Sequence, residues 1–178
     1  MGSSDETKLP PDALEGLAAR VGASVQGDHD GRGLRIGLAC GLFNGAISWR
    51  LLDGALDALR ASGVDPSDTT VAWVPGAFEL PMVARGFARS GAVDAVACLG
   101  AVIRGETGHY DFVAGECARG IQRVQLDTGV PVIFGVLTTD TVDQAMARSG
   151  TGDTNKGREA ALTAVEMVRL LRSPHLSH

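Results

Sequence analysis

The segment Val102-Ile103-Arg104-Gly105-Glu106-Thr107-Gly108-His109-Tyr110-Asp111 decides how this chain folds. It completes an apolar run, Ala92 to Ile103, that is typical of a buried strand, and it opens a helical pattern from His109 to Leu126. A strand, a short glycine-bearing loop and a helix start leave free backbone N–H groups pointing outward, and the helix dipole adds positive potential. The segment therefore predicts a strand–loop–helix unit that is suited to bind an anion.

Two side chains of this loop suit chemistry on a small phosphorylated molecule. Thr107 adds a hydroxyl donor, and His109 adds an imidazole, the side-chain type most often used for proton transfer in enzymes. The sequence has neither the Gly-Lys-Ser/Thr of a P-loop nor a dinucleotide-binding glycine pattern at this point, so the ligand should be smaller than a nucleoside triphosphate. Strand–glycine–helix turns are common, however, and a histidine at a helix start is often only a capping residue. The segment alone therefore leaves a structural interpretation open beside the catalytic one.

The alternation of strand and helix continues outward from this unit in both directions. Apolar strand patterns alternate with amphipathic helical patterns, as in βαβ units. Strands are expected at Leu34–Cys40, Thr69–Val74, Val93–Ile103 and Pro131–Leu137, and helices at Ile47–Ser62, Phe78–Ser90, His109–Leu126, Asp143–Arg148 and Asn155–Leu171. We therefore expect an α/β fold of three layers, with a central, mostly parallel four-stranded sheet flanked by helices.

A binding site in such a fold is expected at one edge of the sheet. Ligands of parallel sheets bind beyond the carboxyl ends of the strands. The segments expected there are Leu42–Asn44, Pro75–Glu79, Arg104–His109 and Thr138–Asp140. We expect these four segments to form one cluster.

Composition narrows the class of protein. A chain of 178 residues suits one domain, and a net charge of −5 with scattered basic residues argues against a nucleic-acid partner. No apolar stretch approaches the roughly 20 residues that span a bilayer, and the polar start lacks the core of a signal peptide, so we expect no membrane partner and a cytoplasmic location. Cys40, Cys98 and Cys117 lack metal-ligand spacing and are expected to be buried free thiols, and no metal site is expected.

Three regions follow from the same pattern. Residues 1–32 form a polar N-terminal extension, in which Asp12–Val25 has the pattern of a short helix. Residues 33–173 form the α/β domain, and residues 174–178 form a C-terminal tail.

Five short blocks of sequence, taken in their order along the chain, carry a resemblance to a known family. They are Phe43-Asn44, Pro75-Gly76-Ala77-Phe78-Glu79-Leu80-Pro81, Val102 to Val113, Phe134-Gly135-Val136-Leu137-Thr138-Thr139 and Asn155-Lys156-Gly157. In these blocks the chain resembles the lumazine synthase (6,7-dimethyl-8-ribityllumazine synthase) family, from about Gly33 to Arg172. The resemblance implies a flavodoxin-like fold. It also implies a cofactor-free step of the riboflavin pathway, in which 5-amino-6-(D-ribitylamino)uracil and 3,4-dihydroxy-2-butanone 4-phosphate condense to 6,7-dimethyl-8-ribityllumazine, releasing phosphate and water.

The resemblance also implies roles for individual residues. His109 would transfer protons, and the phosphate would be bound by Gly105, Glu106, Thr107 and Arg148. The pyrimidine and its ribityl chain would be bound by Phe43, Asn44, Ala77, Phe78, Glu79, Val102, Ile103, Phe134 and Lys156. Phe134, Arg148 and Lys156 would come from a neighbouring subunit. The resemblance therefore implies a homo-oligomer, either a pentamer or a sixty-subunit assembly of pentamers, and it suggests riboflavin synthase as a partner.

Alternatives remain because some positions depart from the family pattern. Leu42 replaces a residue that is often basic or polar, Gly108 replaces a common Thr or Pro, and Gly152-Asp153-Thr154 lacks a basic residue. One alternative is a catalytically altered paralogue that acts as a flavin- or lumazine-binding protein or as a shell protein. The other is an FMN-binding or response-regulator domain. A response regulator should have an acidic pair after its first strand, where this chain has Gly41-Leu42-Phe43.

Overall fold

Four strands form one sheet in the order β2-β1-β3-β4, and every neighbouring pair is parallel. Their bounds are β1 Ile36–Gly41, β2 Thr69–Val74, β3 Ala95–Ile103 and β4 Val132–Thr139. These come from a computed structural model that describes residue 13, residues 16–17 and residues 20–176. The expected three-layer α/β fold with a four-stranded sheet is confirmed.

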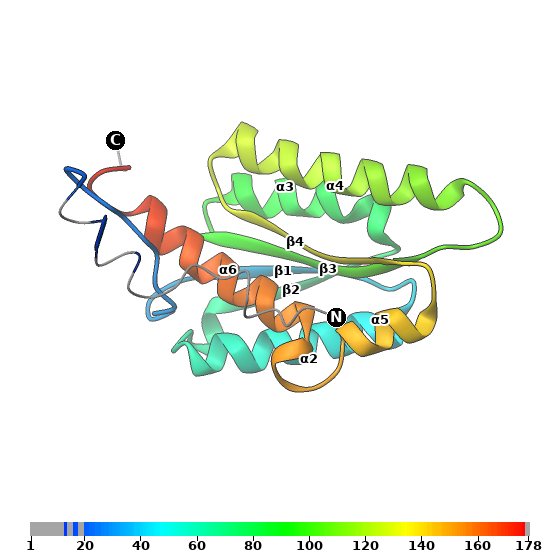
Figure 1. Ribbon diagram of the computed structural model, residues 1–178. Coiled ribbons are helices and arrows are strands. Elements are labelled where there is room, and N and C mark those ends of the chain that lie inside the picture. The colour runs from blue at the N-terminus through cyan, green and yellow to red at the C-terminus, as the bar shows by residue number, and fades with distance from the viewer. Residues whose placement is uncertain (1–12, 14–15, 18–19, 177–178) are drawn as a thin grey trace.

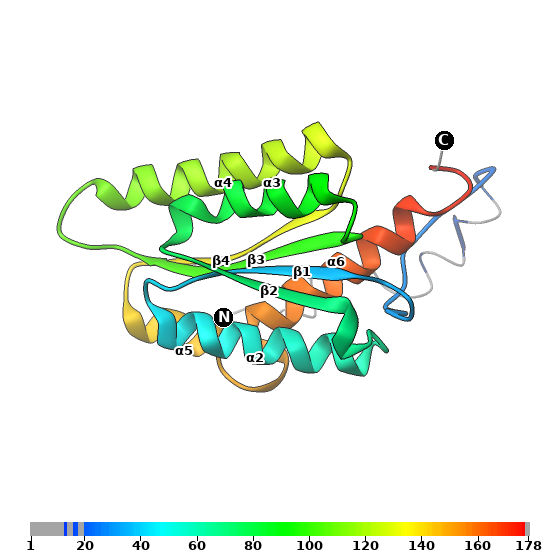
Figure 2. The ribbon, with the colours of Figure 1, turned by 180° about the vertical axis from the view of Figure 1, so that it is seen from behind.

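Helices cover both faces of the sheet. They are α2 Gly45–Ala61, α3 Leu80–Ser90, α4 His109–Thr128, α5 Val142–Arg148 and α6 Lys156–Leu171, with short 3-10 turns at Pro66–Asp68, Ala77–Glu79 and Gly152–Thr154. Figure 1 shows α3 and α4 on one face and α2, α5 and α6 on the other. Figure 2 shows the same two layers from behind.

Two cores result from the alternation of side chains along the central strands. In β3, Ala97 and Leu99 point toward the core under α2 and α6, whereas Val96 and Cys98 point toward the core under α3 and α4. β1 and β3 are almost completely buried because helices cover both of their faces, while the edge strands β2 and β4 are partly exposed. This explains why β1 and β3 are apolar almost throughout.

The second predicted helix begins later in the structure than the sequence pattern predicts. The prediction placed a continuous helix over Phe78–Ser90, whereas the chain first makes a 3-10 turn over Ala77–Glu79 and begins α3 at Leu80. Pro81 explains the boundary, since its ring fits only in the first turn of a helix. The turn keeps residues 77–79 at the end of β2.

The three cysteines are buried and unpaired. Burial raises the pKa of the Cys40 and Cys117 thiols to about 12, and it also raises the pKa of Cys98. These thiols are therefore protonated and unreactive near neutral pH. Within the described ranges, no group of three or more His, Cys, Asp or Glu residues is placed to hold a metal ion, and no helix is long and apolar enough to cross a membrane.

The predicted helix at Asp12–Val25 lies partly outside the described residues. Residues 13, 16 and 17 are helical, whereas residues 20–25 form a turn, a bend and irregular chain, so the prediction is wrong for its last residues. The described segment just before the first strand runs beside the C-terminal part of α6. There the Arg169 guanidinium donates hydrogen bonds to the carbonyl oxygens of Asp30 (2.6 Å) and Arg32 (2.8 Å). The chain therefore enters β1 from an anchored position.

Candidate active site

The carboxyl ends of three strands open onto one pocket of about 500 Å³, which we call the sheet-end pocket. It lies where the chain passes from β1 outward to β2 and later returns to β3, the switch point at which ligands of open α/β sheets bind. Its lining consists of Phe43, Asn44, Pro75, Gly76, Ala77, Phe78, Glu79, Ala101, Val102, Ile103, Gly105, Thr107, His109, Tyr110 and Val113. Three of the four expected segments therefore meet here.

The fourth segment, Thr138–Asp140, does not line this pocket, so the expectation of a single cluster is wrong on this point. β4 is the edge strand beyond β3, and the chain after it turns toward the opposite helix layer as α5. Thr138 instead lines a second pocket, and Asp140 contacts Arg104. The position of β4 at the edge thus separates its end from the other three.

Asn44 is held in a strained conformation at the floor of the sheet-end pocket. Its backbone is left-handed, with φ of 58° and ψ of 37°, which asparagine tolerates better than most residues. Its Nδ2 donates a hydrogen bond of 3.0 Å to the carbonyl oxygen of Ala101 in β3. Strain of this kind is concentrated at functional sites. The bond to β3 fixes the side-chain amide beside the pocket.

Phe43 presents an exposed aromatic ring beside Asn44. A phenylalanine at a strand end is usually part of the core, yet this side chain is 74% exposed. Its backbone N–H donates to the carbonyl oxygen of Pro75 (2.9 Å), which joins the end of β1 to the end of β2. The ring is therefore available to a ligand while its backbone is fixed.

Glu79 is positioned by its own turn. One carboxylate oxygen accepts a hydrogen bond of 3.0 Å from the backbone N–H of Gly76, which closes the 3-10 turn. The other oxygen accepts no hydrogen bond from the part of the chain that the structure describes, and Glu79 lines the pocket. Glu79 thus combines a capping role with a free acceptor.

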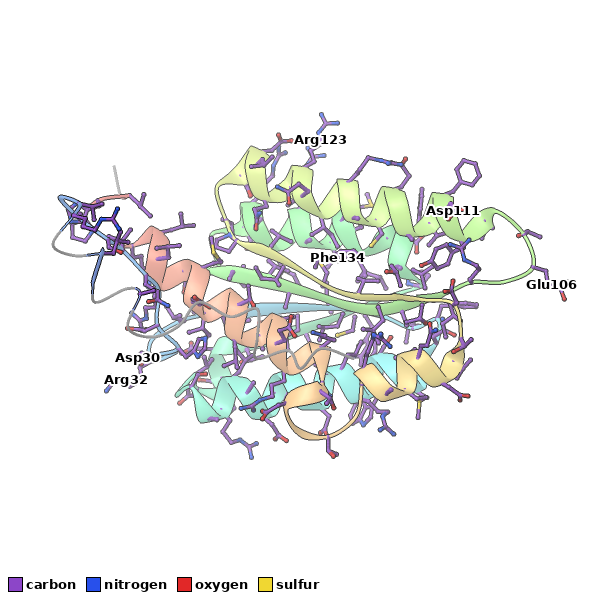
Figure 3. All side chains as sticks on the ribbon, viewed as in Figure 1. Asp30, Arg32, Glu106, Asp111, Arg123 and Phe134 are labelled. Carbon is purple, nitrogen blue, oxygen red and sulfur yellow. The ribbon has the colours of Figure 1, made fainter. Side chains whose placement is uncertain are left out.

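The loop after β3 carries the candidate phosphate ligands. Gly105 and Thr107 line the pocket, and exposed His109 begins α4 beside them. The Thr107 Oγ1 lies 3.4 Å from the backbone nitrogen of His109, a long contact for a helix cap. Glu106 does not line the pocket: Figure 3 shows it at the outer tip of the loop. Only its backbone is thus suited to the predicted phosphate contact.

Arg104 holds both ends of this loop, a role that the sequence pattern did not reveal. Its backbone N–H donates to the carbonyl oxygen of Thr139 (2.9 Å), and its Nε donates to an Asp140 carboxylate oxygen (2.9 Å). The guanidinium also lies 4.0 Å from the ring centroid of Tyr110 and 3.4 Å from an Asp111 oxygen. Arg104 thereby links β4 to the first turn of α4. The acidic residues at both places were the available signal in the sequence.

Phe134, Arg148 and Lys156 lie elsewhere, in a second pocket of about 390 Å³. This edge pocket is lined by residues 133–138 of β4, the end of α5 and the first half of α6, and it shares no lining residue with the sheet-end pocket. Figure 3 shows Phe134 on β4, well away from the loop that carries Glu106. One copy of the chain therefore does not bring all predicted site residues together.

Both cations of the edge pocket already have partners in their own chain. An Arg148 guanidinium nitrogen donates a hydrogen bond of 3.0 Å to the carbonyl oxygen of Gln144, one turn earlier in α5. The Lys156 ammonium forms an ion pair with Glu159 in the first turn of α6. Both side chains are exposed, so these contacts are easily exchanged for stronger ones.

The two pockets differ in chemistry. The sheet-end pocket offers apolar and aromatic walls, backbone groups, an amide, a carboxylate and an imidazole, but its lining includes no lysine or arginine. The edge pocket offers two cations beside an exposed phenylalanine. Together the two pockets suit a ligand that has a flat polar ring and an anionic group.

Comparison with known protein families gives a match over most of the chain. The sequence model of one family, described as 6,7-dimethyl-8-ribityllumazine synthase, matches residues 33–172. The match spans the whole sheet and all five helices α2 to α6.

Proposed function

This chain belongs to the 6,7-dimethyl-8-ribityllumazine synthase family, and we propose that it catalyses the condensation for which the family is named. Membership places the chain in riboflavin-pathway lumazine synthesis. The proposed substrates are 5-amino-6-(D-ribitylamino)uracil and 3,4-dihydroxy-2-butanone 4-phosphate. The observation that carries the proposal is the sheet-end pocket, where an exposed aromatic ring, a strained asparagine and a loop bearing His109 meet.

The pyrimidine would bind on the side of the pocket formed by the ends of β1 and β2. The ring of Phe43 is exposed and suited to stack on a flat heterocycle. Ala77 and Phe78 after β2, and Val102 and Ile103 at the end of β3, line the same pocket, and their backbone groups would hydrogen-bond the pyrimidine edge.

The ribityl chain would bind next to the ring. Its hydroxyl groups can donate to the Asn44 Oδ1, since the Asn44 Nδ2 is the atom that bonds Ala101. They can also donate to the Glu79 oxygen that is not used by Gly76. Both side chains are prepositioned by backbone contacts, which lowers the entropy lost on binding.

The phosphate would bind at the loop before α4. Backbone N–H groups of Gly105, Glu106 and Thr107, the Thr107 hydroxyl and the positive end of the α4 dipole favour an anion there. The His109 imidazole stands at the same helix start. A proton-transfer group and an anion site are thus adjacent.

The reaction needs both features. The amine attacks the ketone, and loss of water gives an imine. Elimination then releases the phosphate, and the ribityl-bearing nitrogen closes the second ring with loss of a second water. Protons move in each step, and we assign His109 to their transfer.

The edge pocket would complete the sheet-end pocket of a neighbouring copy. In this arrangement Arg148 would leave the Gln144 carbonyl for the phosphate, which accepts a bidentate, charge-assisted pair of hydrogen bonds. Lys156 and Phe134 would approach the pyrimidine side from the same neighbour. We therefore propose a homo-oligomer, a pentamer or a sixty-subunit assembly of pentamers.

Mixing the two substrates with purified protein tests the reaction. The expected result is equal amounts of fluorescent lumazine and inorganic phosphate, formed faster than in a protein-free control. Protein that binds flavin or lumazine tightly but does not accelerate the reaction would contradict the proposal and favour a binding or shell protein.

Light scattering tests the shared site separately. The expected assembly contains at least five copies. A fully active monomer or dimer would contradict the shared site while leaving the proposed reaction intact.

A further inference from the structure

We propose that Asn155 is a positioning residue that sets the spacing between Arg148, which would bind the phosphate, and Lys156, which would approach the pyrimidine. The inference rests on the proposed function and deepens it. Arg148 is the last residue of α5, and Lys156 is the first residue of α6. Asn155 occupies the junction between the two helices and is only 3% exposed.

The amide nitrogen of Asn155 fixes the chain that follows α5. Nδ2 donates hydrogen bonds to the carbonyl oxygens of Gly150 (2.8 Å) and Arg50 (2.9 Å). The first bond closes the loop between the two helices, and the second ties that loop to α2. An amide donor is needed, because both partners are carbonyl oxygens.

The amide oxygen of Asn155 fixes the start of α6. Oδ1 accepts hydrogen bonds from the backbone N–H groups of Gly157 (2.8 Å) and Arg158 (3.1 Å), so Asn155 is the N-cap of this helix. Lys156 lies between the capping residue and these bonded positions. Its backbone therefore cannot shift without breaking the cap.

Ser149 extends the same network to Arg148. The Ser149 carbonyl oxygen accepts a hydrogen bond of 3.0 Å from Arg50 Nε and lies 3.5 Å from the Asn155 Nδ2. Ser149 is 1% exposed and directly follows Arg148. The backbone on the C-terminal side of Arg148 is thus held to α2 through the same group of contacts.

Helix α2 acts as the rigid support for this network. A Cβ atom on Gly157 would lie 1.9 Å from the Leu51 carbonyl oxygen, and one on Gly54 would lie 2.5 Å from the Asn155 side chain. Such close approach of the helices leaves Asn155 no alternative position. The three residues of the Asn-Lys-Gly block therefore have separate roles. Asn155 positions the end of α5 and the start of α6, Lys156 would bind a ligand, and Gly157 allows α2 and α6 to approach closely.

The test variant is Asn155→Ser, which keeps an oxygen for the N-cap and removes both amide donors. We expect its KM for the phosphorylated ketone to rise on the order of tenfold, because the chain that follows Arg148 loses the amide donors that fix it. The KM for the pyrimidine and the kcat at saturating ketone should change less than about threefold, because the serine oxygen still caps α6 and keeps Lys156 in place. Calorimetric titration with inorganic phosphate should show a similar loss of affinity without turnover.

Two further variants separate positioning from general damage. Arg50→Ala removes only the Nε contact to Ser149 and should give the same selective change with a smaller size, which keeps the test available if Asn155→Ser does not fold. Asp94→Asn is the matched control, because its carboxylate bonds Arg35 and Arg172 at the opposite end of β3. It should lower the melting temperature and leave both KM values unchanged.

Mixed assemblies test whether Asn155 acts on the site that its copy shares with a neighbouring copy. If each site is shared between two copies, an Asn155→Ser subunit supplies an intact sheet-end pocket and a His109→Ala subunit supplies an intact edge pocket. In a random equal mixture of the two variants, about a quarter of the sites combine these two intact halves. These sites should regain the wild-type KM for the ketone.

Two outcomes would overturn the inference. One is an equal loss for both substrates in Asn155→Ser, and the other is wild-type phosphate affinity in that variant. A wild-type protein without turnover would instead overturn the proposed function itself.

Discussion

The sheet-end pocket and the edge pocket are built in opposite ways. The first is made of loops at strand ends, and its polar groups are fixed by backbone contacts, such as the bond from Asn44 to Ala101. The second is made of side chains on β4, α5 and α6, and its cations are occupied by Gln144 and Glu159 of the same chain. The first pocket therefore supplies apolar walls and fixed polar groups without a lysine or arginine, and the second supplies two cations. Neither suffices alone for a phosphorylated substrate, so we expect the chemistry to depend on the two meeting.

The largest effect should come from His109 in the sheet-end pocket. His109→Ala should lower kcat on the order of 10²-fold while leaving both KM values within a few-fold, because proton transfer acts in the transition state. Steady-state rates at saturating concentrations of both substrates measure it. The uncatalysed formation of imine can reduce the loss. Full turnover in this variant would remove the catalytic role from this pocket.

Arg148 in the edge pocket should come next. Arg148→Ala should raise the KM for the phosphorylated ketone roughly 10- to 100-fold, since one charge-assisted contact contributes about 1.5–3 kcal/mol. The KM for the pyrimidine should be nearly unchanged. Arg123→Ala, on the exposed side of α4, is a suitable control for loss of an arginine. Equal losses for both substrates would mean that Arg148 does not contact the phosphate selectively.

Phe43 should show the opposite preference with a smaller size. Phe43→Ala removes a stacking face of about 0.5–1.5 kcal/mol beyond its buried area, so the KM for the pyrimidine should rise by about tenfold or less. The KM for the ketone should change little. Phe43→Tyr keeps the aromatic face and should restore the wild-type value. A larger effect on the ketone than on the pyrimidine would reverse the assignment of the subsites.

The smallest effect concerns the backbone of Asn44. Asn44→Ala should lower the free energy of unfolding by about 1–2 kcal/mol, because alanine is disfavoured in the left-handed region and the bond to Ala101 is lost. Asn44→Gly relieves the strain and should retain more of the stability, although it also loses the side chain. Urea unfolding of the two variants measures the difference. If alanine proved the more stable, the left-handed conformation would not limit this position.

The strands show how accurately the hydrophobic pattern of a sequence predicts the bounds of a strand. β2 was placed at its observed bounds, and β1 and β3 were placed to within a few residues, because buried strands leave long apolar runs. The predicted end of β4 at Leu137 was two residues early, since the polar Thr138 and Thr139 still pair with β3. Backbone pairing continued where the hydrophobic signal had stopped.

The site residues show a different limit. Ten of the fourteen named from the resemblance line the sheet-end pocket, three line the edge pocket, and Glu106 lines neither. Arg104 and Asn155 were not given a role, although they hold the loop and the helix start on which the candidate ligands stand. Arg104 also contacts Asp140, and Asn155 contacts Arg50. These two partners are 36 and 105 residues away in sequence, and no local pattern reports such contacts.

Local chemistry by itself determined the order of strands and helices, the apolar faces that form two cores and the glycine-bearing loop before His109. Each of these depends on residues within one or two turns of each other, whose periodicity is written in the chain. Only the tertiary structure decided that β4 lies at the sheet edge and that Phe134, Arg148 and Lys156 gather in a pocket apart from His109. The tertiary structure also decided that α2 lies close enough to α6 to hold the Asn155 side chain in place. Those outcomes depend on which strands pair and how closely helices approach, and packing across the whole domain determines both.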